Sequence, residues 1–241
     1  MALGAMQPYL FPYLGYFQLM DCVDTYVFCG NLQYIKRGWV NRNRIFTNMR
    51  ESETYSFSFS VVKDDYTKNI NQRYYSNLKE DGDKLKRILF QAYKKAVNFE
   101  ETYGLVEDIL SFQNDNVAYF NMNANYQIAK YLGIEAKITC ADMVEDPVFQ
   151  ENFRQLDYEG RVIYICNYFR EKTYVNAING MSLYHRDYFA AEGIDLKFIK
   201  MDEIVYPQLS KQFVSHLSIL DVLMHNSVRD AQSLLRRYQL V

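Results

Sequence analysis

The chain has 241 residues, of which 49% are apolar, and a formal net charge of −2. This length fits one large domain or two small ones, and the apolar content allows a full hydrophobic core. No apolar run approaches the ~18 residues of a membrane-spanning helix, and no signal peptide is visible, so we expect a cytoplasmic protein without a membrane span.

The first elements of the chain predict a βαβ unit. Residues 2–6 form a short apolar strand, residues 13–20 a helix, and residues 25–29 a buried strand rich in β-branched and aromatic side chains. Such a unit places its two strands in parallel and its helix on one face of the sheet.

Strands and helices continue to alternate along the chain. Polar and apolar residues alternate over 55–61, which predicts a strand, and apolar stripes at helical spacing predict helices between 84 and 133. Gly133 is expected to end the last of these helices. Later strands are expected at 136–139, 162–166 and 196–201, and helices with apolar faces at 213–224 and 231–238. We therefore predict one α/β domain over residues 1–241, with a mainly parallel sheet, a βαβ start, a helical insertion at 84–133 and a helical C-terminus.

The four cysteines are not spaced as a zinc site. They are Cys22, Cys29, Cys140 and Cys166, without a CxxC pair and without a histidine close by in the sequence. Their apolar neighbours predict buried, reduced thiols, which again favours the cytoplasm. We expect no metal site.

Residues 25–50 carry five cationic side chains and no acidic one, although the whole chain is slightly acidic. The cations are Lys36, Arg37, Arg42, Arg44 and Arg50, and the first four lie close to Trp39, Asn41 and Asn43. Like charges at this density repel unless an anion or water separates them, and a guanidinium fits phosphate with two hydrogen bonds. We interpret residues 33–44, here called the basic segment, as an anion-recognition loop; the alternative is a solvated basic helix face.

A second candidate lies between the first strand and the first helix. Residues 7–17 include Pro8, Pro12 and Gly15; the prolines stiffen the loop and the glycine permits close backbone approach. Ligands of open α/β sheets bind at the carboxyl ends of the strands, where this loop begins. It is either the floor of a ligand pocket or a rigid aromatic turn on the core. No glycine-rich phosphate motif is present.

The acids and bases of the chain do not form a recognisable catalytic set. His216 and His225 are predicted to lie on opposite faces of one helix, so they cannot form a helical metal pair. Asp221 lies in an apolar helix and needs a partner: it either pairs with an Arg of the basic segment or acts as a base. Gln7 and Asp221 are the candidate catalytic residues.

A later loop, residues 174–184, offers polar side chains after a predicted strand. Asn176, Asn179 and Ser182 could bind a sugar or an amide, and the loop could equally be a simple connector.

Several of these stretches together resemble a known family. Residues 7–17, 24–28 and 33–44 closely resemble the WbqC-like protein family, and later segments as far as residue 221 do so as well, so the resemblance covers nearly the whole chain. Many members begin the first motif with His-Gln-Pro, whereas this chain has Met6 before Gln7 and Pro8. Members are associated with gene clusters for O-antigen and other surface polysaccharides.

The resemblance and the basic segment imply an enzyme of the transferase type that acts on a nucleotide-linked amino sugar by acyl or aminoacyl transfer to the sugar amine. In this hypothesis Lys36, Arg37, Arg42 and Arg44 bind the pyrophosphate, Gln7, Asn41 and Asn43 orient the sugar or donor, and Tyr16 or Trp39 stacks on a ring. The partner is then a nucleotide-linked sugar or another phosphorylated small molecule. The sequence specifies neither a cofactor nor an oligomeric state.

Two alternatives stay open. One is a non-catalytic module that binds a nucleotide sugar or a glycan precursor. The other is a protein that binds tRNA or another nucleic acid, which the acidic balance of the chain disfavours because such domains spread cations over a larger face.

Overall fold

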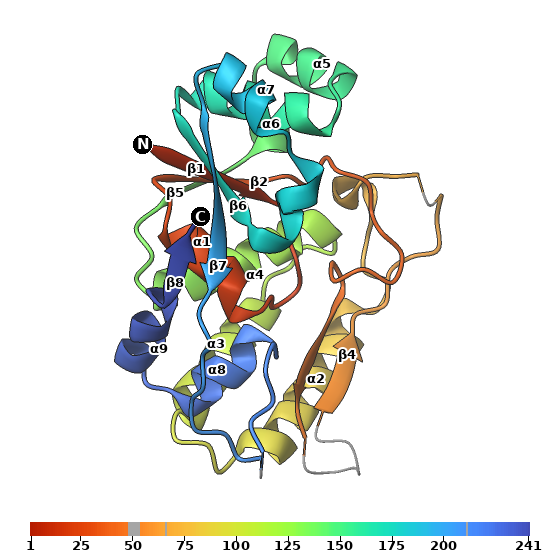
Figure 1. Ribbon diagram of the computed structural model, residues 1–241. Helices are drawn as coiled ribbons and strands as arrows, with labels where there is room; N and C mark the ends of the chain where they lie inside the picture. Colours follow the sequence, from red (N-terminus) through yellow and green to blue (C-terminus); the bar gives the residue numbers. More distant parts are fainter. Residues whose placement is uncertain (48–53, 66, 211) are drawn as a thin grey trace.

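A computed structural model describes residues 1–47, 54–65, 67–210 and 212–241 (Figure 1). Its strands are β1 (Ala2–Met6), β2 (Thr25–Phe28), β3 (Arg42–Phe46), β4 (Thr54–Ser58), β5 (Lys137–Cys140), β6 (Thr173–Ala177), β7 (Asp195–Met201) and β8 (Tyr238–Leu240). Its α-helices are α1 (Leu14–Asp21), α2 (Leu78–Tyr93), α3 (Phe99–Leu110), α4 (Val117–Tyr131), α5 (Pro147–Gln155), α6 (Tyr158–Phe169), α7 (Arg186–Ala191), α8 (Ile219–His225) and α9 (Val228–Leu235). The predicted α/β class is confirmed.

The main sheet has the strand order β5-β2-β1-β6-β7-β8. Its pairs β1–β2, β2–β5, β1–β6 and β6–β7 are parallel, and the edge pair β7–β8 is antiparallel. The predicted βαβ start and mainly parallel sheet are therefore confirmed. The chain runs outward from β1 to β2 and β5, then crosses to the other side of β1 to form β6 and β7. This reversal creates a topological switch point between β1 and β6, where open α/β sheets bind their ligands.

Two hydrophobic clusters cover the opposite faces of this sheet. One joins α1, α4, α8 and α9 to Tyr26 and Phe28, and the other joins α5, α6 and α7 to Leu3 and Val27. Successive residues of a strand point to opposite faces, which is why Val27 faces one cluster and its neighbours the other. In Figure 1 the helices α5, α6 and α7 lie above the sheet.

Between β2 and β5 the chain forms the antiparallel hairpin β3–β4 and the helices α2 to α4. The predicted strand at 55–61 corresponds to β4, and the predicted helical range 84–133 falls on these three helices. The basic segment, interpreted as a loop, ends inside β3, because Arg42–Phe46 pairs with Thr54–Ser58. The assignment of the whole chain to one domain stays a prediction.

The predicted strand at 162–166 is wrong, because these residues lie inside α6. Its buried residues are Val162, Ile165 and Cys166, at the i, i+3, i+4 spacing of a helix. A short apolar run is compatible with either element, and here the burial period shows the helix. The strand that follows is β6, whose residues 174–177 were predicted to belong to a loop.

The helical C-terminal region is confirmed by α8 and α9, but residues 213–224 do not form one helix. His216 has a φ of 55°, which a right-handed helix cannot include. The helix α8 begins only after Ser218, whose side chain accepts a hydrogen bond from the backbone N–H of Leu220. His216 and His225 therefore do not share a helix. Tyr238, expected on the last helix, lies in β8 instead.

Gly133 ends the helical region as predicted, and replacing it should be costly. Its φ is 68°, and an added Cβ would lie 3.0 Å from Nε2 of Gln232. We expect Gly133→Ala to lower the free energy of unfolding by about 1–2 kcal/mol. Gly104→Ala is the matched control: it lies inside α3 with nothing within 4 Å, so it should stabilise by about 0.4–1 kcal/mol. Urea unfolding of both variants tests this, and shifts of the same sign would contradict it.

Candidate functional site

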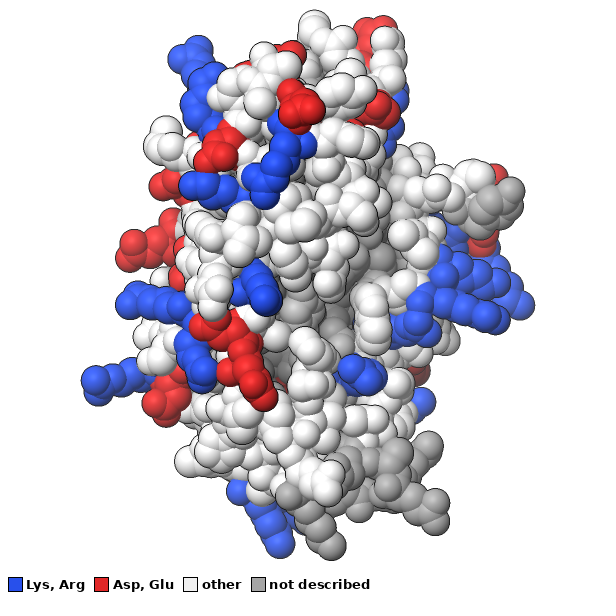
Figure 2. Space-filling view, in the orientation of Figure 1, with Lys and Arg blue, Asp and Glu red and all other residues white. Residues whose placement is uncertain are grey.

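A cleft opens at the topological switch point, between the loops that follow β1 and β6 and the end of β7. We divide it into a first and a second compartment, with volumes of about 510 and 430 Å³. Both are lined by Tyr13, Met201 and His216, so the two compartments are continuous. Figure 2 shows the hollow near the middle of this face, with Lys and Arg side chains gathered to its right, the side on which β4 lies in Figure 1. Volumes of about 300–1,000 Å³ are usual for small-molecule sites.

The first compartment is built from separate stretches of the chain: the loop at 7–13 (the proline loop), α1, the basic segment, the turn after β6, the end of β7 and the segment that precedes α8. Its lining residues are Tyr9, Pro12, Tyr13, Gly15, Gln18, Trp39, Asn43, Arg44, Ala177, Ile178, Asn179, Ile199, Lys200, Met201 and His216. The proline loop and the basic segment thus meet at one edge of the sheet, because they follow the neighbouring parallel strands β1 and β2.

The proline loop is held by buried amide side chains of α4. Asn121 donates from Nδ2 to the carbonyl groups of Pro8 at 3.0 Å and Val40 at 2.7 Å, which ties the loop to the basic segment. Asn125 donates to the carbonyl group of Tyr9 at 2.9 Å. Buried amides that bind backbone carbonyl groups fix a loop without regular structure, so this side of the cleft is formed before any ligand binds.

The same loop contains a strained residue. Phe11 has a φ of 45°, a left-handed conformation that costs a non-glycine residue about 1–2 kcal/mol. Its carbonyl group accepts hydrogen bonds from Asn43 Nδ2 and Ser218 Oγ, both at 2.7 Å. Strain that is held in place by surrounding contacts is frequent at ligand sites.

Arg44, in β3, places an unpaired cation in the first compartment. Its guanidinium lies 6.0 Å from the ring centroid of Trp39, and its buried Nε has no hydrogen-bond partner among the residues that the structure describes. No carboxylate in this part of the chain forms an ion pair with it either. A buried donor without a partner costs about 1–3 kcal/mol, which an anionic ligand would recover.

Gln18, in α1, places a buried acceptor in the same compartment. Its Nε2 donates to the carbonyl groups of Leu234 at 2.9 Å and Arg237 at 3.0 Å, which sets the orientation of the amide. Its Oε1 is buried and has no donor within the described ranges. An amine or hydroxyl group of a ligand would form a hydrogen bond to this oxygen.

Two tyrosines also line the first compartment. Burial raises the pKa of Tyr9 and of Tyr13, so both phenols stay neutral at physiological pH.

Lys200 and His216 line the cleft, although neither was predicted from the sequence as a site residue. Lys200 is exposed and follows the buried Ile199 at the carboxyl end of β7. One signal in the sequence could have identified Lys200. It lies near the carboxyl end of the strand predicted at 196–201, and parallel sheets bind ligands at that edge. His216 gave no such signal, because residues 213–224 have the spacing of a helix.

Three of the other predicted cations, Lys36, Arg37 and Arg42, do not line either compartment. Lys36 and Arg37 are exposed on the outer side of the basic segment. Arg50 lies outside the described residues. Of the described cations of this segment, Arg44 alone lines the cleft.

Arg42 supports the turn that carries Trp39. Its Nε donates to the carbonyl group of Gly38 at 2.9 Å, its Nη2 donates to that of Arg37, and its guanidinium lies 5.6 Å from the ring centroid of Trp39. Trp39 is 46% exposed and lines the first compartment, so its ring remains available to a ligand.

Two further candidates form hydrogen bonds within the fold, and a third lies outside the cleft. Tyr16 is 1% exposed and its hydroxyl donates to the carbonyl group of Gln7 at 2.8 Å, which corrects the expectation that this ring stacks on a ligand. Asn41 donates to the carbonyl group of Phe59 at 2.7 Å and accepts from the hydroxyl of Tyr34 at 2.9 Å. Gln7 lines neither compartment.

Of the three polar residues predicted in the loop at 174–184, one lines the cleft and two do not. Asn176 lies inside β6 and donates to the hydroxyl groups of Tyr174 and Tyr184, both at 2.7 Å, while its Oδ1 accepts from the backbone N–H of Ala177. Asn179 lines the first compartment, and Ser182 is exposed outside it.

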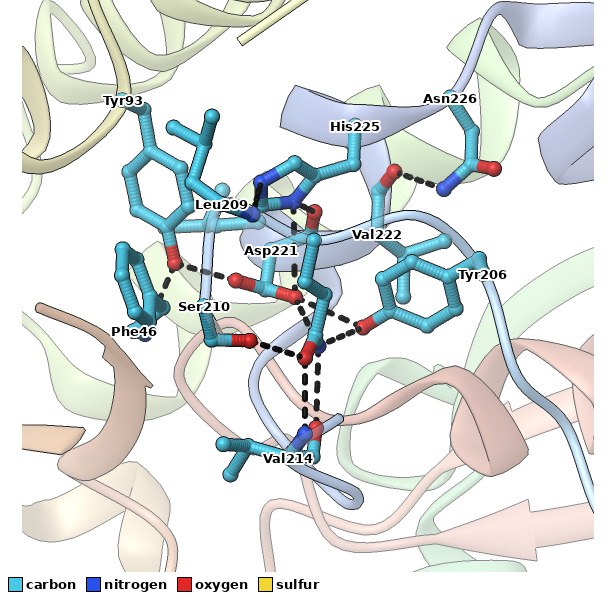
Figure 3. A network of polar contacts seen from close by, with 12 residues as sticks. Phe46, Tyr93, Tyr206, Leu209, Ser210, Val214, Asp221, Val222, His225 and Asn226 are labelled. Atoms are coloured by element: carbon cyan, nitrogen blue, oxygen red, sulfur yellow. Dashed lines mark hydrogen bonds and ion pairs between the residues drawn. The ribbon is translucent and has the colours of Figure 1, made fainter. Parts of the chain in front are cut away.

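Asp221 is fully buried behind the second compartment, where hydroxyl and amide groups satisfy it (Figure 3). Its Oδ1 accepts from the hydroxyl of Tyr93 at 2.6 Å. Its Oδ2 accepts from the hydroxyl of Tyr206 and from Nε2 of Gln208, both at 2.8 Å. The expected pairing with an Arg of the basic segment is wrong, because two phenols and an amide take its place.

His225 completes this network as a neutral ring. Its Nε2 accepts from the backbone N–H of Leu209 at 3.0 Å, so the ring proton is on Nδ1, which donates to the carbonyl group of Asp221 at 2.8 Å. The separation of 3.6 Å between Nδ1 and Oδ2 of Asp221 is therefore not an ion pair. Both residues fasten the chain between β7 and α8.

The sequence pattern of the WbqC-like protein family matches residues 7–233, from the proline loop into α9. The chain belongs to the WbqC-like protein family. It is also similar to the uncharacterized protein Rv1507c of Mycobacterium tuberculosis, with 26% identity over 225 residues and coverage of 89% of each chain. No solved structure matches the chain significantly. In this WbqC-like chain the matched range contains all the residues that line the cleft.

Within the described ranges, no group of three or more His, Cys, Asp or Glu side chains is placed to hold a metal ion. Nor does any helix in those ranges have the length and apolar character needed to cross a membrane. The four cysteines are free thiols; Cys22 is half-buried, the other three are buried, and burial raises the pKa of Cys29 to about 12.

Proposed function

We propose that this WbqC-like protein is an enzyme of surface-polysaccharide biosynthesis that binds a nucleotide-linked amino sugar in the first compartment. The reaction proposed is acyl or aminoacyl transfer to the sugar amine. The observation that carries the proposal is the buried, unpartnered Nε of Arg44 in a cleft at the switch point of a parallel sheet.

The diphosphate is assigned to Arg44 and Lys200, which approach the first compartment from β3 and β7. The N-terminus of α1 adds to the positive potential of these two cations. The helix begins at Leu14 without a side-chain cap, and Gly15 lines the compartment. A helix N-terminus without a cap favours a negative ligand group.

The base and the sugar are assigned to the remaining lining residues. The exposed ring of Trp39 supports stacking of a nucleobase or a sugar ring. The unpartnered Oε1 of Gln18 supports recognition of a ligand amine or hydroxyl group. The assignment to O-antigen and related pathways rests on the family resemblance described above.

A titration with nucleotide sugars tests this function. We expect a nucleoside diphosphate amino sugar at about 100 times its Kd to stabilise the protein by about 2.7 kcal/mol, a rise in Tm of roughly 5–10 °C for a chain of this size. Differential scanning fluorimetry measures the rise in Tm, and calorimetry then measures the Kd. The matched ligand with a hydroxyl group in place of the amine should bind more weakly. No binding of any nucleotide sugar at millimolar concentration would contradict the proposal.

The alternative of a non-catalytic binding module predicts the same titration but no turnover. Mass spectrometry of the sugar after incubation with activated acyl donors distinguishes the two. A steep fall of tRNA affinity with salt, together with no response to nucleotide sugars, would instead favour nucleic-acid binding.

A further inference from the structure

We infer that the second compartment holds an activated acyl group, carried as a thioester or an ester, and that His216 accepts the proton of the amine that attacks it. The identity of the attacking amine rests on the proposed function. The second compartment and its acyl ligand do not, because they are argued from a different set of residues.

The lining of the second compartment fits an acyl group. Its apolar members come from α1, from the segment at 202–217 between β7 and α8, and from α8 itself: Leu14, Ile204, Val205, Phe213, Leu217 and Val222. A cavity of about 430 Å³ with such walls suits a short aliphatic or aminoacyl chain. Two carboxylates, Asp202 and Glu203, stand at the same wall and would favour a donor with an ammonium group.

The outer wall of this compartment is fastened by side chains. Gln208 is bound to the buried Asp221, and it also donates to the carbonyl group of Val214 at 3.0 Å and accepts from its backbone N–H at 2.8 Å. Tyr206 lines the compartment and donates to the same carboxylate (Figure 3). The described parts of this segment, residues 202–210 and 212–217, are thus held by side-chain hydrogen bonds, and the compartment is preformed.

His216 lies where the two compartments meet. Its φ of 55° is held by the neighbouring Ser218, whose N–H donates to the carbonyl group of Arg44 at 2.8 Å and whose hydroxyl donates to that of Phe11. The exposed imidazole contacts the ring of Tyr13 edge-on, with centroids 6.4 Å apart, and makes no hydrogen bond to any described residue. It is therefore free to bind a ligand proton, in a backbone conformation of the kind that functional sites retain.

The proposed step conserves atoms and charge. The amine nitrogen of the ligand in the first compartment attacks the acyl carbonyl carbon in the second, and a C–N bond forms. The C–S or C–O bond to the carrier breaks, and its electron pair leaves with the carrier as thiolate or alkoxide. The proton lost by the amine passes to His216 and then to the leaving group, which restores the neutral imidazole.

A cavity-filling variant tests the location of the acyl group. Val205 is 59% exposed and lines only the second of the two compartments, so Val205→Trp fills it from the surface. Val148→Trp is the control, since Val148 is 65% exposed on α5 and lines neither compartment. The probes are a butyryl thioester of N-acetylcysteamine and alanine ethyl ester, which distinguish a plain acyl donor from an aminoacyl donor.

In Val205→Trp we expect the affinity for the acyl probe to fall by about tenfold or more by calorimetry, with nucleotide-sugar affinity changed by less than about twofold. Val148→Trp should change neither. No binding of either probe to the wild type, or equal losses for both ligand types in Val205→Trp, would overturn the inference. If the acyl probe binds as described while no nucleotide sugar does, the proposed function fails, and the inference that the second compartment holds an acyl group stands.

A second variant tests His216. Asn tolerates a left-handed φ, so His216→Asn keeps the turn while removing the proton acceptor. We expect the rate of amide formation to fall by about 100-fold or more, with both ligand affinities within about threefold of the wild type. His185→Asn is the control, because this exposed ring pairs with Glu159. An unchanged rate of amide formation in His216→Asn would reject the role.

Discussion

Replacing Asp221 with alanine should lower the free energy of unfolding by roughly 3–5 kcal/mol, because several buried donors lose their partner at once and each such loss costs ~1–3 kcal/mol. Asp221 is fully buried, and Tyr93, Tyr206 and Gln208 all donate to its carboxylate. Few single changes have effects of this size, and those that do usually break a buried polar network. The second compartment should also lose affinity for acyl probes, since its wall is fastened to this residue.

Urea unfolding followed by circular dichroism measures this loss. Asp195→Ala is the matched control: its carboxylate is 57% exposed and pairs with Lys197 at 3.2 Å, so its removal should cost less than about 1 kcal/mol. Tyr206→Phe removes one hydrogen bond to Asp221 and should cost about 0.5–1.5 kcal/mol. Tyr93→Phe should cost more, about 1–3 kcal/mol, because the buried backbone N–H of Phe46 also loses its acceptor. A loss for Asp221→Ala no larger than that of the surface control would mean that water replaces the network without cost.

Replacing Arg44 with alanine should weaken the binding of nucleotide diphosphate ligands by about 1.5–3 kcal/mol, or about tenfold to 150-fold in Kd. Arg44 lines the first compartment, pairs with no carboxylate and leaves a buried Nε without an acceptor in the described ranges. An anion bound there gains a charge-assisted hydrogen bond in a partly desolvated site. Arg44→Lys should recover only part of the affinity, because an ammonium group lacks the planar fork.

The control for Arg44 is Arg37→Ala, in the same segment. Arg37 is exposed and lies outside the cleft, so we expect a change in Kd of less than about threefold, which disappears with added salt. Isothermal titration calorimetry at two salt concentrations measures both variants. If Arg37→Ala costs as much as Arg44→Ala, the anion lies on the outer surface of the basic segment, and the first compartment is not its site.

The basic segment shows how far such a site can be predicted from sequence. Its charge density favours anion binding, which stays a prediction, and its position after β2 favours the carboxyl edge of the sheet, where Arg44 lines the first compartment. Yet Arg42 and Arg44 are two residues apart in β3 and share one face of the strand, so alternation does not separate them: Arg44 lines the first compartment, while Arg42 supports the turn of Trp39. The difference lies in the neighbours that each guanidinium meets in the packed chain, which local charge does not reveal.

Buried polar residues limited the prediction in another way. Asn176 and Asn41 have the composition of ligand-binding loops, but their amides satisfy hydroxyl and carbonyl groups of the fold. A free side chain and a satisfied one are identical in sequence, because the difference lies in partners distant along the chain. Asp221 was recognisable as a buried carboxylate that needs partners, and its neighbours in the fold were not.

By itself, the sequence determined the α/β class, the βαβ start, the helices of the middle region and the family, because these depend on local periodicity and on motifs that are contiguous. The tertiary structure alone decided that α6 is a helix, that His216 stands outside α8, and that Lys200 and His216 meet Arg44 at one cleft. The physical reason is that burial and hydrogen-bond partners are properties of the packed chain: residues 44, 200 and 216 become neighbours only when the strand order places the ends of β1, β6 and β7 side by side.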